Sequence, residues 1–347
     1  MKIALPRSSM NRVDLYEEAG FDVTEGSGRT EEEMIALLRD ADGAHVNTLP
    51  LTTRRVLEAC PRLKVISRFG VGVDSIDLDA ATELGVLVCN VPGSNTTEVA
   101  DHAVALLLAL TRNVVGAVAT VRAGEWGERA MDVRRSVRRI AGHNVGIIGF
   151  GNIGRAFATR MRGFGPDRII AYDPFVSQLT GDLYGVRMVD LDELLGESDF
   201  ISIHCSLTDE SHHLINDQTL ALMRPTALLV NTARGPIVDG AALARALSGG
   251  QIQAAALDVT EVEPIEDDNP LMTLPNCLLT PHAAGFSQVF LQECAIRQAQ
   301  NVIRVLTGEG PPHGLANPEV IKVVAVMRAT DPGRWAGVPD FSTALML

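Results

Sequence analysis

Three segments in the second half of the chain place reactive side chains just beyond short apolar runs. Arg234 follows one run, and Glu261 and Glu263 follow the next. His282 follows the last run. A guanidinium can grip a carboxylate and a keto oxygen together, because its donors form a planar fork. An imidazolium can protonate a carbonyl as hydride reaches the carbon, and a carboxylate beside it favours the charged form. These residue types fit the reduction of a 2-keto acid and the reverse oxidation.

A glycine-rich segment earlier in the chain is typical of a turn that binds a dinucleotide. It reads Gly149-Phe150-Gly151-Asn152-Ile153-Gly154, it follows the apolar run Val145–Ile148, and it opens into a helical pattern. Glycines at this spacing permit a tight turn, close approach to a pyrophosphate and close helix–strand packing. The phosphates would accept hydrogen bonds from N–H groups at the start of the helix. The predicted cofactor contacts in this turn are Gly149, Gly151, Asn152, Ile153 and Gly154.

Asp173, nineteen positions after Gly154, is the residue that selects the cofactor. Its carboxylate would accept hydrogen bonds from a ribose diol and repel a 2′-phosphate, which favours NAD over NADP. Pro174 and Phe175 follow it, and neither can neutralise a phosphate. We predict NAD as the cofactor. Arg168 and Arg155 keep NADP open as the alternative, since each is a cation near this part of the sequence.

The reactive residues need a framework that brings strand ends together. Six strand candidates follow residue 144, the number expected of a full dinucleotide-binding sheet. They are Asn144–Ile148, Arg168–Tyr172, Phe200–His204, Leu228–Asn231, Ala254–Leu257 and Cys277–Leu279. The carboxyl ends of parallel strands line one edge of a sheet, where ligands bind. The arginine, a glutamate and the histidine are therefore expected to converge at that edge.

The first hundred residues predict another parallel sheet, because short apolar runs alternate there with helical patterns such as Glu31–Arg39. The strand candidates are Lys2–Leu5, Ala44–Val46, Lys64–Ser67 and Val86–Asn90. A long apolar helix is predicted at Glu98–Thr111. A further long helical pattern, Ser287–Thr307, follows the last strand and suggests that the chain returns to the first domain.

The predicted fold class is α/β, with two doubly wound parallel-sheet domains. The NAD-binding Rossmann domain, residues 99–288, is expected to be inserted into a discontinuous substrate domain. That substrate domain is predicted to cover residues 1–98 and 289–347. Two chain crossings between the domains would form a hinge, which suits a reaction that must exclude water.

Bulk composition limits the class of protein. The 347 residues suffice for two domains, and a hydrophobic content of 46% supports real cores. A net charge of −13 argues against a general affinity for nucleic acid or anionic membranes. The first apolar run is too short for a signal peptide, and the longest, Ala103–Leu110, is well below a membrane span. We expect a soluble, cytoplasmic protein that binds neither nucleic acid nor membrane.

The sequence predicts no metal site. The five cysteines are scattered, without a Cys-x-x-Cys pair, as is typical of free thiols in a reducing compartment. The pair His212-His213 has no accompanying cysteine or carboxylate pattern, and adjacent side chains are expected to point apart. We interpret this pair as part of a solvated turn.

Several separated motifs resemble those of the D-isomer-specific 2-hydroxyacid dehydrogenases, a family that includes phosphoglycerate dehydrogenase and glyoxylate/hydroxypyruvate reductases. The resemblance runs from about Lys64 to Pro318 and includes the glycine turn and the three reactive segments. Its other motifs are Ser67-Arg68-Phe69-Gly70-Val71-Gly72-Val73-Asp74, Asn90-Val91-Pro92-Gly93-Ser94-Asn95 and Val99-Ala100-Asp101-His102. The resemblance implies an NAD-dependent enzyme acting on a small 2-keto or 2-hydroxy acid. It also implies a homodimer, with the apolar helix Ala100–Thr111 as the expected interface.

The resemblance implies a catalytic role for three positions. Arg234 would bind the substrate carboxylate, Glu263 would orient His282, and His282 would be the acid/base. Glu263 rather than Glu261 takes this role, because the family pattern has its glutamate immediately before the proline at Pro264.

The resemblance also implies binding roles. Backbone N–H groups of Val71 and Gly72 would hold the substrate carboxylate from the other domain. Asp258 would lie at the carboxamide of NAD. The full set of implied NAD contacts beyond the glycines is Asn152, Ile153, Asp173, Cys205, Thr232, Ala233, Asp258 and Gly285.

The segments Ser211–Asp217 and Thr280–Ala284 resemble the C-terminal-binding-protein branch, which contains NAD-sensing transcriptional co-repressors. That branch typically has tryptophan where Gly285 stands. A binding protein that senses NAD(H) with little turnover is therefore the alternative to an enzyme. Formate dehydrogenases of the same superfamily usually have an amide at the position of Glu263, so that activity is not expected.

Overall fold

The computed structural model describes residues 1–310, 312–330 and 332–340. They form two compact units, of which unit 1 comprises Met1–Asn95 and the segment that begins at Ser287. Unit 2 comprises Thr96–Phe286. The sequence placed the two boundaries after residues 98 and 288, three and two residues later than the observed divisions. The predicted substrate domain also includes residues 311, 331 and 341–347, which lie outside the described residues.

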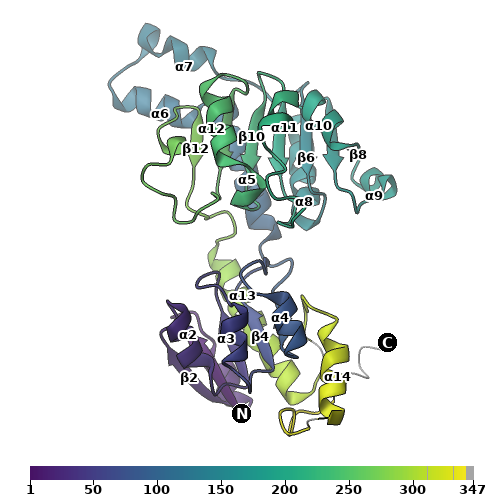
Figure 1. The fold of residues 1–347 in the computed structure, drawn as a ribbon. Coiled ribbons are helices and arrows are strands. Elements are labelled where there is room, and N and C mark those ends of the chain that lie inside the picture. Colours follow the sequence, from purple (N-terminus) through teal and green to yellow (C-terminus); the bar gives the residue numbers. More distant parts are fainter. Residues whose placement is uncertain (311, 331, 341–347) are drawn as a thin grey trace. The chain divides into compact units, whose positions relative to one another are not determined.

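Unit 1 is built on a parallel sheet with the strand order β2-β1-β3-β4-β5 (Figure 1). Its strands are β1 (Lys2–Pro6), β2 (Asp22–Gly26), β3 (Gly43–Val46), β4 (Val65–Arg68) and β5 (Leu87–Cys89). Its helices are α1 (Val13–Glu18), α2 (Glu31–Leu38), α3 (Arg54–Glu58), α4 (Leu78–Glu83), α13 (Gln288–Thr307) and α14 (Val320–Thr330).

The predicted long helix after the last strand forms α13, and local capping explains its ends. The side chain of Ser287 accepts a hydrogen bond from the backbone N–H of Phe290, and Gly308 ends the helix with a φ of 75°. The Gln298 side chain of α13 donates to the carbonyl of Ser67 at 3.0 Å. Asn301 donates to the carbonyl of Asn90 at the same distance. The returning helix is thereby bound to the β4 and β5 region of unit 1.

Unit 2 contains a parallel sheet with the strand order β12-β11-β10-β9-β6-β7-β8. The strands are β6 (Asn144–Ile148), β7 (Arg168–Tyr172), β8 (Arg187–Met188), β9 (Phe200–Ile203), β10 (Leu228–Asn231), β11 (Ala254–Leu257) and β12 (Cys277–Leu279). The order reverses at β6, which is the switch point at which Rossmann-type sheets bind ligands.

Helices and short 3₁₀ helices connect these strands. The helices are α5 (Thr96–Thr111), α6 (Val114–Arg122), α7 (Met131–Arg135), α8 (Asn152–Met161), α9 (Gln178–Leu183), α10 (Leu191–Glu197), α11 (Asp217–Leu222) and α12 (Gly240–Ser248). The 3₁₀ helices are η1 (Gly127–Ala130), η2 (Arg162–Phe164), η3 (Gly235–Ile237) and η4 (Pro270–Met272).

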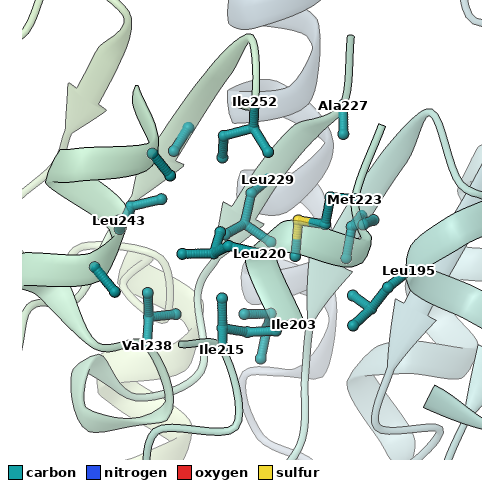
Figure 2. Close-up of a cluster of buried hydrophobic side chains, with 14 of the residues drawn as sticks. Leu195, Ile203, Ile215, Leu220, Met223, Ala227, Leu229, Val238, Leu243 and Ile252 are labelled. Carbon is teal, nitrogen blue, oxygen red and sulfur yellow. The ribbon is translucent and has the colours of Figure 1, made fainter. Parts of the chain in front are cut away.

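The unit 2 sheet is buried on both faces, as its apolar strands require. Successive strand residues point to opposite faces, so Leu229 and Val230 of β10 enter different clusters. Leu229 joins the cluster with Leu220 and Leu243, which Figure 2 shows between the sheet and the helices that cover it. Val230 joins the cluster on the other face. The fold class predicted from the sequence, two parallel-sheet α/β domains, is confirmed.

Two strands were missed by the sequence analysis, β2 and β8. Both lie at the edge of their sheets. The β2 strand is polar and largely exposed, and β8 has only two residues, so neither produces an apolar run. The prediction of six strands for the second domain was therefore wrong, because its sheet has seven.

Among the described residues, no single helix is both long and apolar enough to cross a membrane. The adjoining helices α5 and α6 reach that length and composition only when taken together, and they are bent by 57°.

Candidate active site

The glycine turn lies at the carboxyl end of β6, between the strands where the sheet order reverses. The backbone N–H of Gly149 donates to the carbonyl of Tyr172 at 2.8 Å, which bonds the turn to β7. Asn152 begins α8, and Gly151 precedes it as the N-cap residue. The first N–H groups of this helix point out of its N-terminus and have no partners within the helix. This is the arrangement that binds a phosphate.

Each glycine of the turn meets a different spatial demand. Gly149 has a φ of 89°, and a methyl group there would lie 2.3 Å from the backbone nitrogen of Cys205. A methyl on Gly154 would lie 2.2 Å from the carbonyl oxygen of Gly149. Gly151 is different, because a methyl there would meet no protein atom within 4 Å. Two glycines allow the turn to close, and the third leaves open space where a pyrophosphate would approach.

These differences predict opposite outcomes for two similar substitutions. Gly149→Ala should destabilise the protein by about 3 kcal/mol, because it combines a left-handed backbone with a backbone clash. Gly151→Ala should leave thermal stability unchanged, since its φ of −76° suits alanine. It should nevertheless weaken NADH binding by about 10-fold or more, because the methyl would occupy the pyrophosphate approach. Thermal melts and NADH titration by fluorescence test both; undiminished NADH binding by Gly151→Ala would contradict this assignment.

Asp173 lies at the carboxyl end of β7 and is bonded to the glycine turn. Its Oδ2 accepts from the backbone N–H of Phe150 at 2.8 Å, and its Oδ1 accepts from that of Phe175 at 2.9 Å. Each carboxylate oxygen has a second lone pair. Asp173 can therefore accept from a ribose diol while it holds the turn.

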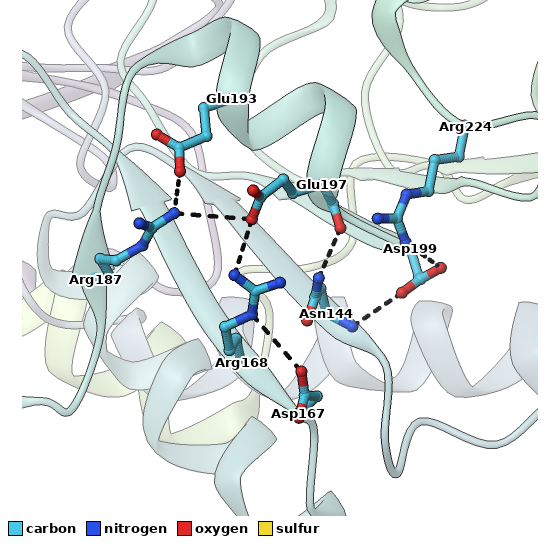
Figure 3. Close-up of polar contacts among 8 residues, drawn as sticks. All are labelled: Asn144, Asp167, Arg168, Arg187, Glu193, Glu197, Asp199 and Arg224. Atoms are coloured by element: carbon cyan, nitrogen blue, oxygen red, sulfur yellow. Dashed lines mark hydrogen bonds and ion pairs between the residues drawn. The ribbon is translucent and has the colours of Figure 1, made fainter.

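The two arginines that kept NADP open as the alternative both have partners within the protein. Arg168 lies at the opposite end of β7, where it pairs with Glu197 at 3.1 Å and with Asp167 at 3.6 Å (Figure 3). Arg155 donates through Nε to the carbonyl of Phe150 at 2.9 Å. Of the two, only Arg155 lies at the glycine turn.

Arg234 is presented by a short loop after β10 that Asn231 organises. The Asn231 side chain is fully buried; it accepts from the N–H of Ala233 at 2.9 Å and donates to the carbonyl of Arg234 at 2.8 Å. The Arg234 side chain donates through Nη1 to the carbonyl of Ala233 at 2.7 Å. Asn231 was not singled out from the sequence. An amide at the end of an apolar run, three residues before Arg234, was the available signal.

Glu263 and His282 form a direct pair. His282 Nδ1 lies 2.7 Å from Glu263 Oε2, and both side chains are about one-third exposed. Burial would raise the pKa of Glu263, but the hydrogen bond and charge of His282, with a contribution from Arg234, lower it overall. The charge of Arg234 thus acts on this carboxylate. The structure therefore brings Arg234, Glu263 and His282 to one edge of the sheet, where His282 is bonded to Glu263 through Nδ1.

The buried Asp258 holds the turn around His282, which we call the histidine turn. Its Oδ1 accepts from the hydroxyl of Thr280 at 2.6 Å and from the N–H of Ala283 at 2.9 Å. Its Oδ2 accepts from the N–H of Ala284 at 2.8 Å. These bonds support His282 at a φ of 51°, a backbone conformation that side chains other than glycine rarely adopt. The observed contacts of Asp258 hold the turn, and its contact with the NAD carboxamide stays a prediction.

The other predicted contacts are divided between the units. Cys205 follows β9 beside Gly149; burial, with a smaller contribution from the Asp173 carboxylate, raises the pKa of its thiol to about 11. Thr232 is buried after β10, and its hydroxyl has no hydrogen-bond partner among the described residues. Gly285 ends the histidine turn.

Val71 and Gly72 belong to unit 1, in the loop after β4, where the Asn90 side chain donates to the carbonyl of Val71. The other residues with predicted roles belong to unit 2.

The residues of the glycine turn in unit 2 fit a dinucleotide, because the turn offers open space at Gly151, unpaired helix N–H groups and a carboxylate at Asp173.

The pair His212-His213 differs from its expected geometry. The two rings stack with centroids 4.1 Å apart, and His213 Nε2 lies 2.6 Å from Glu261 Oε1. The expectation that they point apart was wrong, because His213 has a φ of 49° that turns the chain. Within the described ranges, no group of three or more His, Cys, Asp or Glu residues could hold a metal ion.

Comparison with known proteins identifies the family. Residues 104–284 match the model of the D-isomer specific 2-hydroxyacid dehydrogenase NAD-binding domain, which is more than half of the chain. The chain belongs to this family. Its members are oxidoreductases that act on 2-hydroxy acids, and the matching segment lies within unit 2, which carries the glycine turn. NAD is therefore the cofactor of this domain, as the sequence predicted.

Relatives support this assignment along most of the chain. A glyoxylate reductase of Korarchaeum cryptofilum is 44% identical over 77% of this chain and 80% of its own length. A D-3-phosphoglycerate dehydrogenase of Methanocaldococcus jannaschii is 40% identical over 86% of this chain, which spans only 56% of that protein. The structure of an NAD-dependent formate dehydrogenase from Staphylococcus aureus in complex with NAD aligns with a TM-score of 0.76 and 32% identity. It covers 88% of this chain and 94% of that one.

Proposed function

We propose that this protein is an NAD-dependent D-2-hydroxyacid dehydrogenase that reduces a small 2-keto acid when NADH is available. The observation that carries the proposal is the His282–Glu263 pair at 2.7 Å, with the charge of Arg234 acting on it, at the same sheet edge as the glycine turn. Bound NADH would supply the hydride. The chain itself would supply the proton, keep the acid/base oriented and bind the substrate.

His282 would give its Nε2 proton to the carbonyl oxygen, since its Nδ1 is bonded to Glu263. Glu263 would stabilise the imidazolium and keep the ring oriented. Arg234 would bind the carboxylate and the keto oxygen through parallel donors. Val71 and Gly72 would add backbone N–H groups from unit 1, the proposed substrate domain. Oxidation of the hydroxy acid would use the same groups in reverse.

The experiment is an assay of NADH oxidation with a panel of 2-keto acids. The panel comprises glyoxylate, hydroxypyruvate, pyruvate, phenylpyruvate and 3-phosphohydroxypyruvate. Glyoxylate and 3-phosphohydroxypyruvate represent the two activities named for the relatives. Turnover with one compound would support the proposal and identify the preferred side chain. Tight NADH binding without any turnover would contradict it and support the alternative of an NADH-sensing binding protein.

Asp173 is expected to set the cofactor preference. Asp173→Asn removes the charge that repels a 2′-phosphate but keeps an oxygen that can accept from Phe150 or Phe175. The preference for NADH over NADPH, as a ratio of kcat/KM, should fall by about 10-fold, or about 1.4 kcal/mol. Asp167→Asn, at the other end of β7, is the matched control. An unchanged ratio would show that Asp173 is not the selector.

We also propose a homodimer, through a surface other than the one expected from the sequence. Ala100, Ala103 and Leu107 of α5 are buried within their own unit, whereas Val104, Leu108 and Leu110 are only partly buried. In contrast, α6 and the segment after it expose apolar side chains, and α6 buries none of its residues. The exposed apolar side chains of α6 and the segment after it are Val114, Val115, Val118, Val121 and Trp126. Figure 1 shows α6 and α7 extending away from the sheet of unit 2. Sedimentation of Val118→Asp as a dimer would contradict this interface.

A further inference from the structure

A second histidine–carboxylate pair lies beside the proposed catalytic pair. His213 Nε2 is 2.6 Å from Glu261 Oε1, and Glu261 precedes Glu263 by two residues. The other oxygen of Glu261 accepts from the backbone N–H of Gly240 at 2.8 Å. Glu261 and Glu263 therefore bind two different histidines from one short segment, the loop that follows β11.

The position of His213 is enforced by its own backbone. Its N–H donates to the carbonyl of Pro236 at 2.8 Å, and its carbonyl accepts from the Asn216 side chain at 2.9 Å. Its φ of 49° lies in the left-handed region, which residues other than glycine rarely adopt. His282 lies in the same region. Such conformations persist where surrounding contacts enforce them, and they concentrate at functional sites. The ring of His213 is therefore a fixed anchor for Glu261.

The His213–Glu261 pair joins the two loops that carry Arg234 and Glu263. Pro236 belongs to η3, which begins immediately after Arg234. The loop that carries Glu263 lies directly against η3, because a methyl on Gly235 would come within 1.9 Å of the Thr260 carbonyl oxygen. The Glu263 loop and the Arg234 loop are thus in backbone contact, and the His213–Glu261 pair fastens them on the side of η3.

We propose that His213 and Glu261 are positioning residues, which hold the Glu263 loop so that Glu263 meets His282. The inference rests on the proposed function, since it concerns the same site. The pair acts on geometry rather than on overall stability. Both side chains are about one-third exposed, and exposed ion pairs contribute little to the free energy of unfolding. Small displacements of a catalytic group, in contrast, cost much of the rate.

Three single variants and one double variant, His213→Gly with Glu261→Ala, test the pair. His213→Gly removes the ring, and glycine adopts the φ of 49° without strain, so folding is not impaired. Glu261→Ala removes the carboxylate. Each should lower kcat for keto acid reduction by about 10-fold while KM and NADH affinity change little. Glu261→Gln should retain most of the activity, because an amide can accept from Gly240 and donate to a neutral His213. The double variant should lose no more than either single variant, as expected for two residues that act as a unit.

The matched control is an exposed ion pair of similar length elsewhere in unit 2. Asp217 and Arg245 lie 2.7 Å apart and join α11 to α12. Asp217→Ala should leave kcat unchanged. Wild-type kcat in both His213→Gly and Glu261→Ala would overturn the proposal.

A second measurement separates this proposal from the proposed function. Hydrogen exchange of the backbone N–H groups in residues 259–263 should be faster in His213→Gly and Glu261→Ala than in the wild type. It should not change in Asp217→Ala. If no 2-keto acid is turned over by the wild type, the proposed function fails, but the exchange still decides whether the pair holds this loop. Unchanged exchange in both variants would overturn the proposal.

Discussion

Replacing His282 with asparagine is expected to lower kcat for 2-keto acid reduction by about 10³-fold, within the usual range for loss of a general acid. In the proposed mechanism the imidazole supplies the proton that the carbonyl oxygen must gain, and an amide cannot replace it. NADH binding should remain, because the glycine turn and Asp173 are untouched. Stopped-flow measurement of NADH oxidation, with NADH affinity by fluorescence, gives both quantities.

Asparagine is the informative substitute, because it tolerates the left-handed backbone that His282 adopts at a φ of 51°. Loss of activity then reports the missing imidazole rather than a distorted turn. His313→Asn, at an exposed position in unit 1, is the control for the substitution itself. Turnover by His282→Asn within a few-fold of the wild type would remove His282 from the role of acid.

Arg234→Lys is expected to lower kcat/KM for the keto acid by about 100-fold, equivalent to about 2.7 kcal/mol of transition-state stabilisation. Lysine keeps the charge but is a point donor, and it cannot make the two parallel hydrogen bonds of a guanidinium. The loop itself should persist, because Asn231 bonds the backbone on both sides of the side chain rather than the side chain itself. NADH affinity should be unchanged.

Steady-state kinetics over a range of keto acid concentrations check this prediction. Arg245→Lys, in the exposed pair with Asp217, is the matched control and should behave as the wild type. Retained kcat/KM in Arg234→Lys would show that the substrate carboxylate binds elsewhere.

The central strands of the fold could be predicted from the sequence because they are continuously apolar. The predicted ranges of β6, β7 and β10 agree with the structure to the residue. A strand buried on both faces needs such a run, and short runs separated by helical patterns imply parallel pairing. The edge strands β2 and β8 could not be predicted this way, since an edge strand packs less against the core and is free to be polar.

Spacing along the chain determined which residues could meet, because parallel strands bring their carboxyl ends to one edge. Spacing therefore predicted that Arg234, a glutamate and His282 lie near the glycine turn. Spacing alone did not distinguish Glu261 from Glu263, and the choice of Glu263 rested on family resemblance through Pro264. The tertiary structure places Glu263 against His282 and gives Glu261 a different histidine.

The sequence by itself determined the fold class, the cofactor turn and the candidate groups, because these depend on local periodicity and on strand order. Only the tertiary structure decided the partner of each group. The buried contacts of Asp258, the support of the Arg234 loop by Asn231 and the anchoring of Glu261 by His213 all join segments that are separate in sequence. Such contacts depend on side-chain direction and on backbone turns such as those at His213 and His282. Neither leaves a periodic pattern in the sequence.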